Sequence, residues 1–444
     1  MNSPAAAPLP RIAIVGSGIS GLATAHNLAG RAEVTLFEAG SYFGGHTNTV
    51  DITLPTAGGP VTHGVDTGFL VFNERTYPKL ISLLAELDVK TARSDMSFSV
   101  QVPGVGKNGS KGQPLEWSGS SLNSVFAQRG NLLNWRFLRM LKDIMRFNRI
   151  TTALAEADAD ADLLQPLGDF LKTQLFSDEF CDWYFLPMMG CIWSCPTDQM
   201  LQFPVATMIR FCYNHGLIQV ARRPQWWTVS GGARHYVEKI VANISDKRLN
   251  TPVRLIERDK EGVRVITDGH TERFDKVVLA THSDQALAML RAPSVAEQQV
   301  LGAIRYQPNR AVLHTDASVL PQKKLAWAAW NYERAQKTER ESAQVCLHYL
   351  LNMLQPLPVE QPVLVSLNPV REIARQHIMG EFEYAHPVFD LAAIRAQTEL
   401  PSLQGQQHTW FCGAWTAYGF HEDGLKSGLQ VARQLMVEIA RDGL

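Results

Sequence analysis

A run of closely spaced glycines near the start of the chain has the residue types needed to hold a pyrophosphate. The apolar segment 11–15 leads into Gly16-Ser17-Gly18-Ile19-Ser20-Gly21, and a helical pattern follows. A strand that passes into a helix through this spacing leaves backbone N–H groups and the positive end of the helix dipole free for an anion. Gly16 permits the tight turn, Gly18 lets a phosphate approach the backbone, and Gly21 lets the helix lie close to the strand. The motif therefore predicts a dinucleotide site.

An acidic residue stands where the second half of such a site belongs. Glu38 ends the strand-like segment 33–38, about the distance downstream at which a carboxylate accepts hydrogen bonds from ribose hydroxyls. Strand, helix and acid are in register, and the next residue, Ala39, is predicted to line the same pocket. A glycine-rich turn without a ligand is the alternative interpretation.

Length and composition limit the remaining possibilities. The chain has 444 residues, too many for one core, and is expected to form two domains. Its 42 basic and 43 acidic residues leave a formal net charge of −1, which does not favour a nucleic acid partner. Six cysteines lie in the chain, and Cys191 and Cys195 have no second ligand pair at zinc-site spacing. Core thiols are therefore predicted, and no metal site.

Two further features concern the cellular location. Residues 1–10 lack the basic and apolar regions of a signal peptide, and they are predicted to be a disordered lead-in. The longest apolar stretch, 183–193, is too short to span a bilayer and contains Pro187 and Gly190. A cytoplasmic protein without a membrane span is therefore expected.

The elements that must position the glycines and the acid change in type along the chain. Residues 76–225 carry mainly helical patterns, and residues 291–399 mix strand and helix. Between them, an antiparallel meander of three short strands is predicted at 254–258, 263–267 and 274–280.

A last strand, 409–412, precedes a helix with a regular apolar face. Asp423 is expected to be the N-cap of this helix. Its apolar residues recur at steps of three and four: Leu425, Leu429, Ala432, Met436 and Ile439. Two separate helix N-termini in a dinucleotide fold favour a cofactor with two electron-rich parts. These would be a pyrophosphate and a flavin ring, whose N1 and O2 gain negative charge on reduction.

Taken in order, these motifs resemble those of the flavin-containing amine oxidase and phytoene desaturase superfamily. The matching set is Gly16 to Gly21, Glu38, Gly44-Gly45-His46, Gly231-Gly232, the meander with Val253, Phe411-Cys412-Gly413, and Asp423 to Gly428. The resemblance implies FAD and an α/β fold. A Rossmann-like FAD-binding domain of the amine oxidase type, discontinuous in sequence, would be joined to a mixed α+β substrate domain. The FAD-binding domain is expected at 1–75, 226–290 and 400–444, and the substrate domain at 76–225 and 291–399.

The resemblance also implies individual contacts to FAD. His46 replaces the arginine of the family's Gly-Gly-Arg loop, which lies at the pyrophosphate and the ring, and it places a titratable group there. Ala414 stands where many amine oxidases carry an acidic residue for the ribityl chain, so that chain must be held in another way. The backbone of Val253 resembles the group that holds the adenine edge. The N–H groups of 422–425 resemble those that meet flavin N1 and O2.

The backbone of Thr67 and Gly68 is expected to approach the second face of the ring, with a simple strand end as the alternative. The full set of residues predicted to bind FAD is Gly16, Ser17, Gly18, Ile19, Ser20, Gly21, Glu38, Ala39, Gly45, His46, Thr67, Gly68, Val253, Gly413, Ala414, Glu422, Asp423, Gly424 and Leu425.

The catalytic residues are predicted from the same resemblance. Two aromatic side chains flank the exposed face of the flavin in the amine oxidases, and their positions correspond to His421 and to Tyr384 or His386. A purely structural role is the alternative for each. If His421 titrates, its pKa is expected near the ordinary value of about 6.5.

The function expected is that of an FAD-dependent oxidoreductase of the amine-oxidase type. It would transfer a hydride from a small or hydrophobic substrate to flavin N5, and dioxygen or another acceptor would reoxidise the flavin. The alternative is an FAD-dependent desaturase or double-bond isomerase acting on a fatty acid, an isoprenoid or another lipid. The apolar run 185–193 allows a tunnel for such a substrate, with plain core as the other interpretation.

Three further possibilities stay open. The basic amphipathic pattern at 135–150 allows peripheral contact with a membrane, although a solvated helix face gives the same pattern. A cofactor-free binding module and an NAD-only dehydrogenase are the remaining alternatives. The intact glycine motif with Glu38 disfavours the first, and the segment 413–428 disfavours the second.

Overall fold

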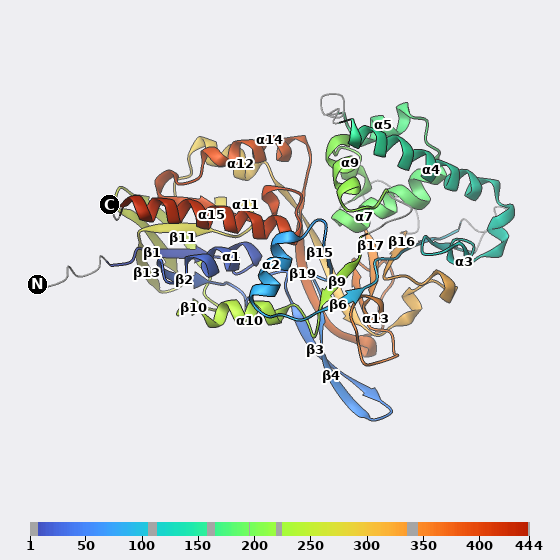
Figure 1. Cartoon of the computed structure of the whole chain (residues 1–444), viewed down its shortest axis with the longest axis horizontal. Helices are drawn as coiled ribbons and strands as arrows, with labels where there is room; N and C mark the ends of the chain where they lie inside the picture. Colours follow the sequence, from blue (N-terminus) through green and yellow to red (C-terminus); the bar gives the residue numbers. More distant parts are fainter. Residues whose placement is uncertain are drawn as a thin grey trace, which may run out of the picture.

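The computed structural model describes residues 8–104, 113–157, 165–194, 196–218, 224–334 and 345–442. Figure 1 shows a parallel sheet with its covering helices at one end of the molecule and the helices α3, α4, α5, α7 and α9 at the other. Most of the predicted N-terminal lead-in and Cys195 lie outside the described residues. Among the described residues, no helix is both long and apolar enough to cross a membrane.

The glycine motif follows the central strand, β1, of a five-stranded parallel sheet with the order β10-β2-β1-β14-β20. Its strands are β1 (Arg11–Val15), β2 (Glu33–Phe37), β10 (Asp246–Arg248), β14 (Lys276–Leu279) and β20 (Thr409–Phe411). Three separate segments of the chain therefore build one sheet. The central strands are apolar and buried along nearly their whole length, as expected where both faces of a parallel sheet are covered.

Helices cover one face of this sheet. They are α1 (Ile19–Leu28), α10 (Arg234–Ala242) and α15 (His421–Asp442), and their apolar residues pack against Ile12 and Ile14. The helices α1 and α15 touch through Gly428, where a Cβ would lie 2.2 Å from the carbonyl oxygen of Ser20. This close approach brings the N-terminus of α15 next to the glycine motif.

The opposite face is covered by an antiparallel meander and three helices. The meander consists of β11 (Val253–Asp259), β12 (Gly262–Thr267) and β13 (His270–Phe274). The helices are α11 (Ser283–Met289), α12 (Val295–Gly302) and α14 (Leu391–Glu399). The prediction of one strand at 274–280 was wrong, because the chain divides at Asp275. β14, in which Val277, Val278 and Leu279 follow Lys276, enters the parallel sheet, where it is buried on both faces between β1 and β20.

A second sheet of seven strands has the order β19-β15-β18-β17-β16-β7-β8. Its strands are β7 (Phe98–Val102), β8 (Leu115–Ser118), β15 (Arg305–His314), β16 (Trp330–Glu333), β17 (Cys346–Leu350), β18 (Leu364–Leu367) and β19 (Ile378–Val388). The segment 76–225, predicted to be mainly helical, therefore also contributes strands. The predicted α/β architecture, a Rossmann-like sheet beside a mixed substrate-domain sheet, is confirmed, and the domain boundaries stay a prediction.

Helices pack around an aromatic core beside this second sheet. They are α3 (Leu122–Val125), α4 (Trp135–Glu156), α5 (Leu167–Thr173), α6 (Asp178–Phe180), α7 (Leu186–Trp193), α8 (Thr197–Met200) and α9 (Val205–Asn214). Phe147, Phe180 and Phe185 lie at the centre of this core, with ring centroids 4.7 to 5.5 Å apart.

Smaller elements complete the fold. They are the hairpin of β3 (Thr49–Thr56) and β4 (Gly59–Asp66), the helices α2 (Pro78–Glu86) and α13 (Leu351–Leu354), and the small sheet of β5 (Phe72–Asn73), β6 (Thr91–Ser94) and β9 (Trp226–Val229).

Candidate active site

A cavity of about 740 Å³ starts at the carboxyl ends of β1 and β2 and runs toward the second sheet. Its volume is in the usual range of ligand pockets, about 300–1,000 Å³. Fifteen of the predicted site residues line it: Gly16, Ser17, Gly18, Ile19, Ser20, Glu38, Ala39, Gly45, His46, Gly68, Val253, His386, Gly413, Ala414 and His421. Seven do not: Gly21, Thr67, Tyr384, Glu422, Asp423, Gly424 and Leu425.

The glycine motif forms a cradle with room for a phosphate. Gly18 precedes α1, has no side-chain cap, and a Cβ built on it would meet nothing within 4 Å. Gly16 has a φ of +99°, and a Cβ there would lie 2.8 Å from the carbonyl oxygen of Ala280. Gly21 lies behind the cradle, where a Cβ would lie 2.0 Å from the Gly16 carbonyl oxygen. The open space at Gly18 and the free first turn of α1 fit a pyrophosphate.

Glu38 holds the loop around this cradle. Its carboxylate accepts hydrogen bonds from the Ser17 N–H at 3.0 Å, the Ser17 hydroxyl at 2.5 Å and the Gly40 N–H at 2.8 Å. A carboxylate offers about four lone-pair sites, so acceptor capacity is left for a ribose hydroxyl. Val253 lines the cavity beside Glu38, at the end that fits the adenosine.

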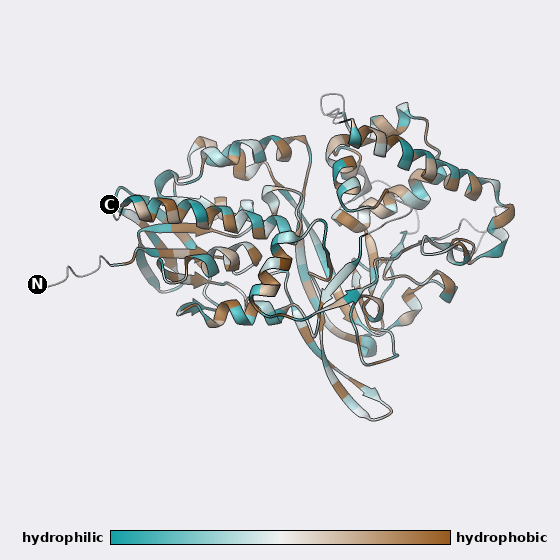
Figure 2. Ribbon diagram, viewed as in Figure 1, coloured by the Kyte–Doolittle hydropathy of each residue, from teal (hydrophilic) through white to brown (hydrophobic). Residues whose placement is uncertain are grey.

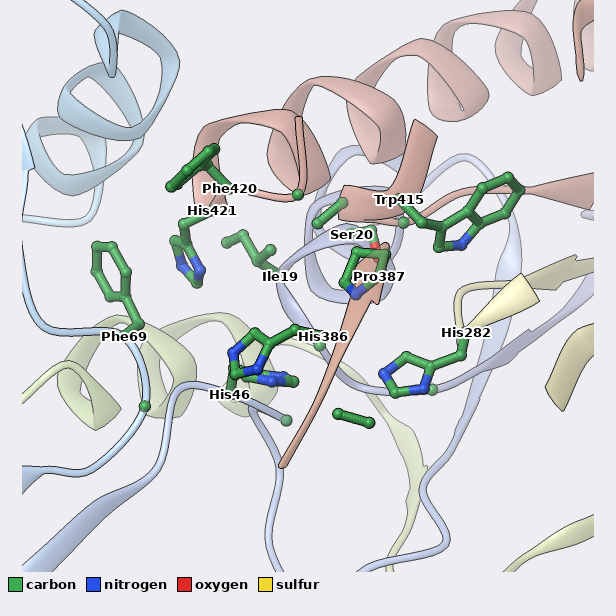
Figure 3. A pocket seen from close by; sticks show the side chains of 18 of the residues that line it. Ile19, Ser20, His46, Phe69, His282, His386, Pro387, Trp415, Phe420 and His421 are labelled. Atoms are coloured by element: carbon green, nitrogen blue, oxygen red, sulfur yellow. The ribbon is translucent and has the colours of Figure 1, made fainter. Parts of the chain in front are cut away.

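Four histidines line the middle of the cavity: His46, His282, His386 and His421 (Figure 3). Burial lowers the pKa of His46 to about 3, with nearby histidines adding to the effect, and it lowers the pKa of His386 to about 4. These rings are therefore neutral at neutral pH. The Nε2 atom of His46 is buried without a partner in the described part of the chain, and it offers a polar contact to a bound ring.

His421 is the first residue of α15 and is fixed on two sides. Its ring stacks on Phe69, with centroids 3.9 Å apart and an interplanar angle of 12°. Its Nε2 lies 2.8 Å from the Tyr236 hydroxyl, which lies 2.5 Å from Thr47 Oγ1. Burial lowers the pKa of His421 to about 3, so the expectation of a pKa near 6.5 was wrong.

The start of α15 differs from the prediction. Asp423 is the third residue of the helix and not its N-cap, and its Oδ2 accepts the Phe420 N–H at 3.0 Å. The N–H groups of Asp423 and Gly424 donate to the Phe420 carbonyl, so they are not free for a flavin. Among the described residues, the N–H groups of His421 and Glu422 have no hydrogen-bond partner, and these two are the donors that could meet the N1 and O2 edge.

The side chains that follow His421 have structural positions. The carboxylate of Glu422 accepts the N–H groups of Lys79 and Leu80 at 3.0 and 2.9 Å, and so caps the start of α2. Leu425 is buried in the core, and a Cβ on Gly424 would lie 2.8 Å from Ile19 Cγ2. Except for the N–H of Glu422, residues 422–425 therefore do not reach the cavity but pack behind its wall.

Tyr384 and Thr67 also lie one layer behind the cavity wall. The Tyr384 hydroxyl lies 2.7 Å from Thr67 Oγ1 and 3.1 Å from Asn48 Nδ2. Its ring centroid is 5.0 Å from that of His46. Tyr384 is therefore placed to position His46, whereas His386 reaches the cavity and accepts a hydrogen bond from Asn309 Nδ2 at 2.9 Å.

The far part of the cavity is an aromatic chamber that the sequence analysis missed. It is lined by Phe69, Tyr77, Phe211, His215, Trp226, Trp330, Tyr349 and Phe420. No local motif connects these residues, which come from segments far apart in the sequence. Of the run 185–193, which suggested a tunnel, Cys191 and Ile192 reach the cavity, and Phe185 is buried in the core.

The chamber carries no formal charge in the part of the chain that the structure describes. Among the described lining residues, Glu38 is the one acid and Arg254 the one Lys or Arg, and both lie at the adenosine end. A smaller side cavity of about 90 Å³ shares Met96, Cys191, Ile192, Leu217 and Trp330 with the chamber. It continues to Gly119 and Ser120, which are exposed.

A buried ionic cluster lies apart from the cavity lining. Glu333, Cys346 and His348 have ligand-type atoms within 4.8 Å of one another, and they form the one group among the described residues with the makings of a metal site. Arg371 Nε lies 2.9 Å from the Glu333 carboxylate, and His348 Nε2 lies 3.0 Å from it. The ion pairs already satisfy this carboxylate, so the cluster is explained without a metal.

Comparison with known proteins supports FAD as the cofactor of this cavity. A family model described as flavin containing amine oxidoreductase matches residues 19–349. Wild-type putrescine oxidase bound to putrescine is 16% identical in sequence, with a TM-score of 0.66 over 97% of this chain and 99% of that one. Comparison with curated proteins gives no match.

Two further solved structures have the same fold. Cyclohexylamine oxidase from Brevibacterium oxydans IH-35A is 16% identical, with a TM-score of 0.64 over 98% of this chain and 100% of that one. A CLA-producing fatty acid isomerase from P. acnes is also 16% identical, with a TM-score of 0.64 over 96% of this chain and 98% of that one. At this identity the likeness concerns the fold alone.

Proposed function

This chain belongs to the family of flavin containing amine oxidoreductases and is an FAD-dependent oxidoreductase, and from this premise we propose that its substrate is a long apolar carbon chain, as in a lipid. The observation that carries the proposal is the uncharged aromatic chamber, with the side cavity that shares five lining residues with it. An alkyl or alkenyl chain would bury its surface there without leaving a charge unpaired.

The fold itself does not choose between substrates, because the similar structures include oxidases of putrescine and cyclohexylamine and an isomerase of fatty acids. The lining of the chamber favours an uncharged substrate over a charged amine. An ammonium group in a buried site needs a carboxylate or a similar partner. The described part of the chamber offers none, and its lining contains no lysine of the kind that holds a water near flavin N5 in many amine oxidases.

The proposed reaction removes two hydrogens from neighbouring carbons of the chain. FAD, when bound, would supply the two-electron oxidation: one hydrogen would be taken from the chain as a hydride, with its electron pair, and the other lost as a proton while a carbon–carbon double bond forms. Dioxygen or another acceptor would then take the two electrons. The neutral imidazole of His421 lines the cavity and is the group available to accept the proton.

The protein's main contribution is to position the chain and exclude water. Phe69 and His421 form a stacked wall, and Tyr236 and Thr47 hold the His421 ring in place. Fixing the reacting carbon against the flavin is worth several kcal/mol of barrier in well-oriented systems, roughly 7–11 kcal/mol at most.

Oxidation of an apolar amine is the second candidate function. The stacked pair of Phe69 and His421 favours it, because two flat rings at the cavity wall resemble the aromatic pair that guides a neutral amine in the family. Such an amine would have to bind in its uncharged form, because the described lining of the chamber holds no acid.

The experiment that separates the two candidates is anaerobic bleaching of the bound flavin. Equal concentrations of an 18-carbon fatty acid, its methyl ester, an 18-carbon alkylamine and butylamine would be compared. The proposal predicts bleaching by the lipid chains and a product two hydrogens lighter. Bleaching by the amines alone would contradict it. Unbleached flavin with a shifted double bond in an unsaturated lipid would show isomerisation in place of net oxidation.

A substitution in the side cavity provides the matched test. Ile192→Trp would fill the space that Ile192 shares between the chamber and the side cavity. It should lower bleaching by 18-carbon chains at least about tenfold and leave short chains little affected, since a blocked pocket costs roughly 1–3 kcal/mol or more. Leu175→Trp, at an exposed position outside both cavities, is the control.

A further inference from the structure

An unusual share of the exposed apolar side chains lies in one short part of the chain. Thirteen large hydrophobic residues are exposed among the described residues. Six of them lie between positions 122 and 145: Leu122, Leu132, Leu133, Trp135, Leu138 and Met145. Leu122 is 80% exposed, Leu133 89% and Trp135 66%. We call these six residues, with the cations described below, the α3–α4 surface.

The parts of this surface are held together in the fold. The short 3-10 helix η2 (Arg129–Leu133) lies between α3 and α4. Arg129 Nη1 donates to the Phe126 carbonyl at 3.0 Å, and the rings of Phe126 and Phe137 are 5.9 Å apart. Figure 1 shows α3 and α4 at the end of the molecule opposite the parallel sheet, and Figure 2 shows brown and teal positions interspersed along this region.

The chain segment that carries these apolar residues is strongly basic, and of its cations Arg136 is paired with Glu179 of the neighbouring α6. The segment 119–155 contains six basic residues and a single acid, Asp143. Asp143 is buried and accepts hydrogen bonds from the Ser177 N–H and hydroxyl at 3.1 and 2.6 Å. The exposed cations Arg139, Lys142 and Arg149 have no partner in the described part of the chain.

The spacing places apolar and basic side chains on the same exposed face of α4. Trp135, Leu138, Lys142, Met145 and Arg149 follow one another at steps of three and four, so they share one helix face. The opposite face is buried through Phe137, Met140 and Phe147. A helix whose exposed face holds both large apolar and basic residues is typical of binding at a membrane interface.

We propose that the α3–α4 surface docks this protein on an anionic lipid membrane. The leucines and the tryptophan would enter the region between headgroups and acyl chains, and Arg139, Lys142 and Arg149 would meet the anionic headgroups. A folded protein partner is a poorer fit, because such an interface would need acidic groups opposite every cation and a shaped apolar complement.

On the premise of the proposed function, the side cavity would offer a lipid chain a route from the α3–α4 surface to the aromatic chamber. Gly119 and Ser120, which line it, are separated by Ser121 alone from the exposed Leu122 on the docking surface. A lipid chain leaving the bilayer would therefore enter next to the surface that contacts it, and would reach the aromatic chamber past Cys191 and Ile192.

The docking is tested by vesicle co-sedimentation with the FAD-loaded protein and no substrate. Vesicles of phosphatidylcholine with 30% phosphatidylglycerol, roughly the anionic content that gives a marked surface potential, are compared with pure phosphatidylcholine. The proposal predicts at least about tenfold stronger partitioning to the anionic vesicles. It also predicts that added salt weakens this partitioning.

Two sets of variants make the test specific. Arg139→Gln, Lys142→Gln and Arg149→Gln together should lower partitioning about a hundredfold, since each cation near an anionic surface contributes about fivefold. Leu133→Ser with Trp135→Ser should lower it at least about tenfold. Two matched controls, Val437→Ser and the triple change of Lys90, Lys260 and Arg395 to Gln, alter exposed residues elsewhere and should leave it unchanged.

Flavin content and Tm show whether each variant is folded, and light scattering shows its oligomeric state. Equal binding to both kinds of vesicle, or no effect of the two sets of variants, would overturn the proposal. So would a dimer that the Leu133→Ser and Trp135→Ser changes dissociate, because the surface would then pair with a second copy. Since no substrate is present, this result is independent of whether the proposed lipid oxidation is correct.

Discussion

Removing the carboxylate of Glu38 should weaken FAD binding strongly and leave the chemistry almost intact. The side chain accepts three hydrogen bonds from Ser17 and Gly40, and its remaining acceptor capacity faces the adenosine end of the cavity. Glu38→Ala therefore removes any ribose contact and also loosens the loop beside the phosphate cradle.

The size of the effect follows from the bonds lost. A charge-assisted hydrogen bond contributes roughly 1.5–3 kcal/mol. Loss of one such bond raises the Kd for FAD at least about tenfold, and loss of two raises it about a hundredfold or more. Glu38→Gln keeps the length and one acceptor oxygen, so its Kd should lie between those of the native protein and Glu38→Ala.

The assay is a titration of the apoprotein with FAD, followed by quenching of flavin fluorescence. At saturating FAD, the rate of flavin reduction by substrate should stay within about twofold, because Glu38 lies at the end of the cavity away from the aromatic chamber. Glu33→Ala, an exposed acid at the start of the same strand, is the control and should not change the Kd. An unchanged Kd in Glu38→Ala would refute the assignment of this end of the cavity to the adenosine.

Three further predictions concern the His421 ring, the attachment of FAD and the stability of the fold. His421→Ala should keep FAD bound but slow flavin reduction about tenfold or more by loosening the substrate wall; a mutant as fast as the native protein would remove His421 from the site. Because burial lowers the pKa of His421 to about 3, the pH profile of flavin reduction should show no limb near 6.5 that disappears in this variant. Acid denaturation should release FAD into the supernatant, because no cysteine stands at a recognisable linkage position, and flavin retained in the pellet would show a covalent bond. The third prediction concerns His348. Burial alone would lower the pKa of His348, but Cys346 and Glu333 raise this pKa to about 9. This pair should therefore stabilise the fold fully between the ordinary pKa of a glutamate, about 4.5, and about pH 6.5. Its contribution is lost as the pH rises through 9, so Tm should fall between pH 6.5 and 9 in the native protein and change less in Glu333→Gln.

The part of the site that the sequence could predict is the part built from local motifs. The glycine motif and Glu38 lie in or next to a turn whose backbone geometry follows from a few neighbouring residues. Their positions in the cavity could be anticipated for this reason. His46, His386 and His421 were reached through the resemblance, and all three line the cavity.

The aromatic chamber could not be predicted in this way, because it depends on packing between distant segments. Tyr77, Phe211 and Trp226 meet there only through the fold, and an aromatic residue on a helix or strand has the same local pattern in a core and in a pocket. Tyr384 shows the reverse error. Its hydroxyl is held by Thr67 and Asn48, partners that no sequence motif indicates, so it lies behind His46 and not in the cavity.

The helix start at His421 was missed for a related reason. Asp423 has the composition of an N-cap, but its carboxylate accepts the N–H of Phe420 from inside the first turn, as the third residue of a capping arrangement does. Side-chain type alone does not separate these two positions. The strand boundary at Asp275 was also hidden, because β13 and β14 are separated by one residue and are both suited to a strand.

Whether the chamber takes a lipid chain is decided by anaerobic mixing of the purified FAD protein with an 18-carbon lipid chain and, separately, with an alkylamine of the same length. Flavin absorbance and the mass of the products would be followed together. The account predicts that the lipid chain bleaches the flavin and yields a product with one more double bond, at a rate that falls when Ile192→Trp fills the side cavity. Bleaching by the amine with no reaction of the lipid chain would contradict it.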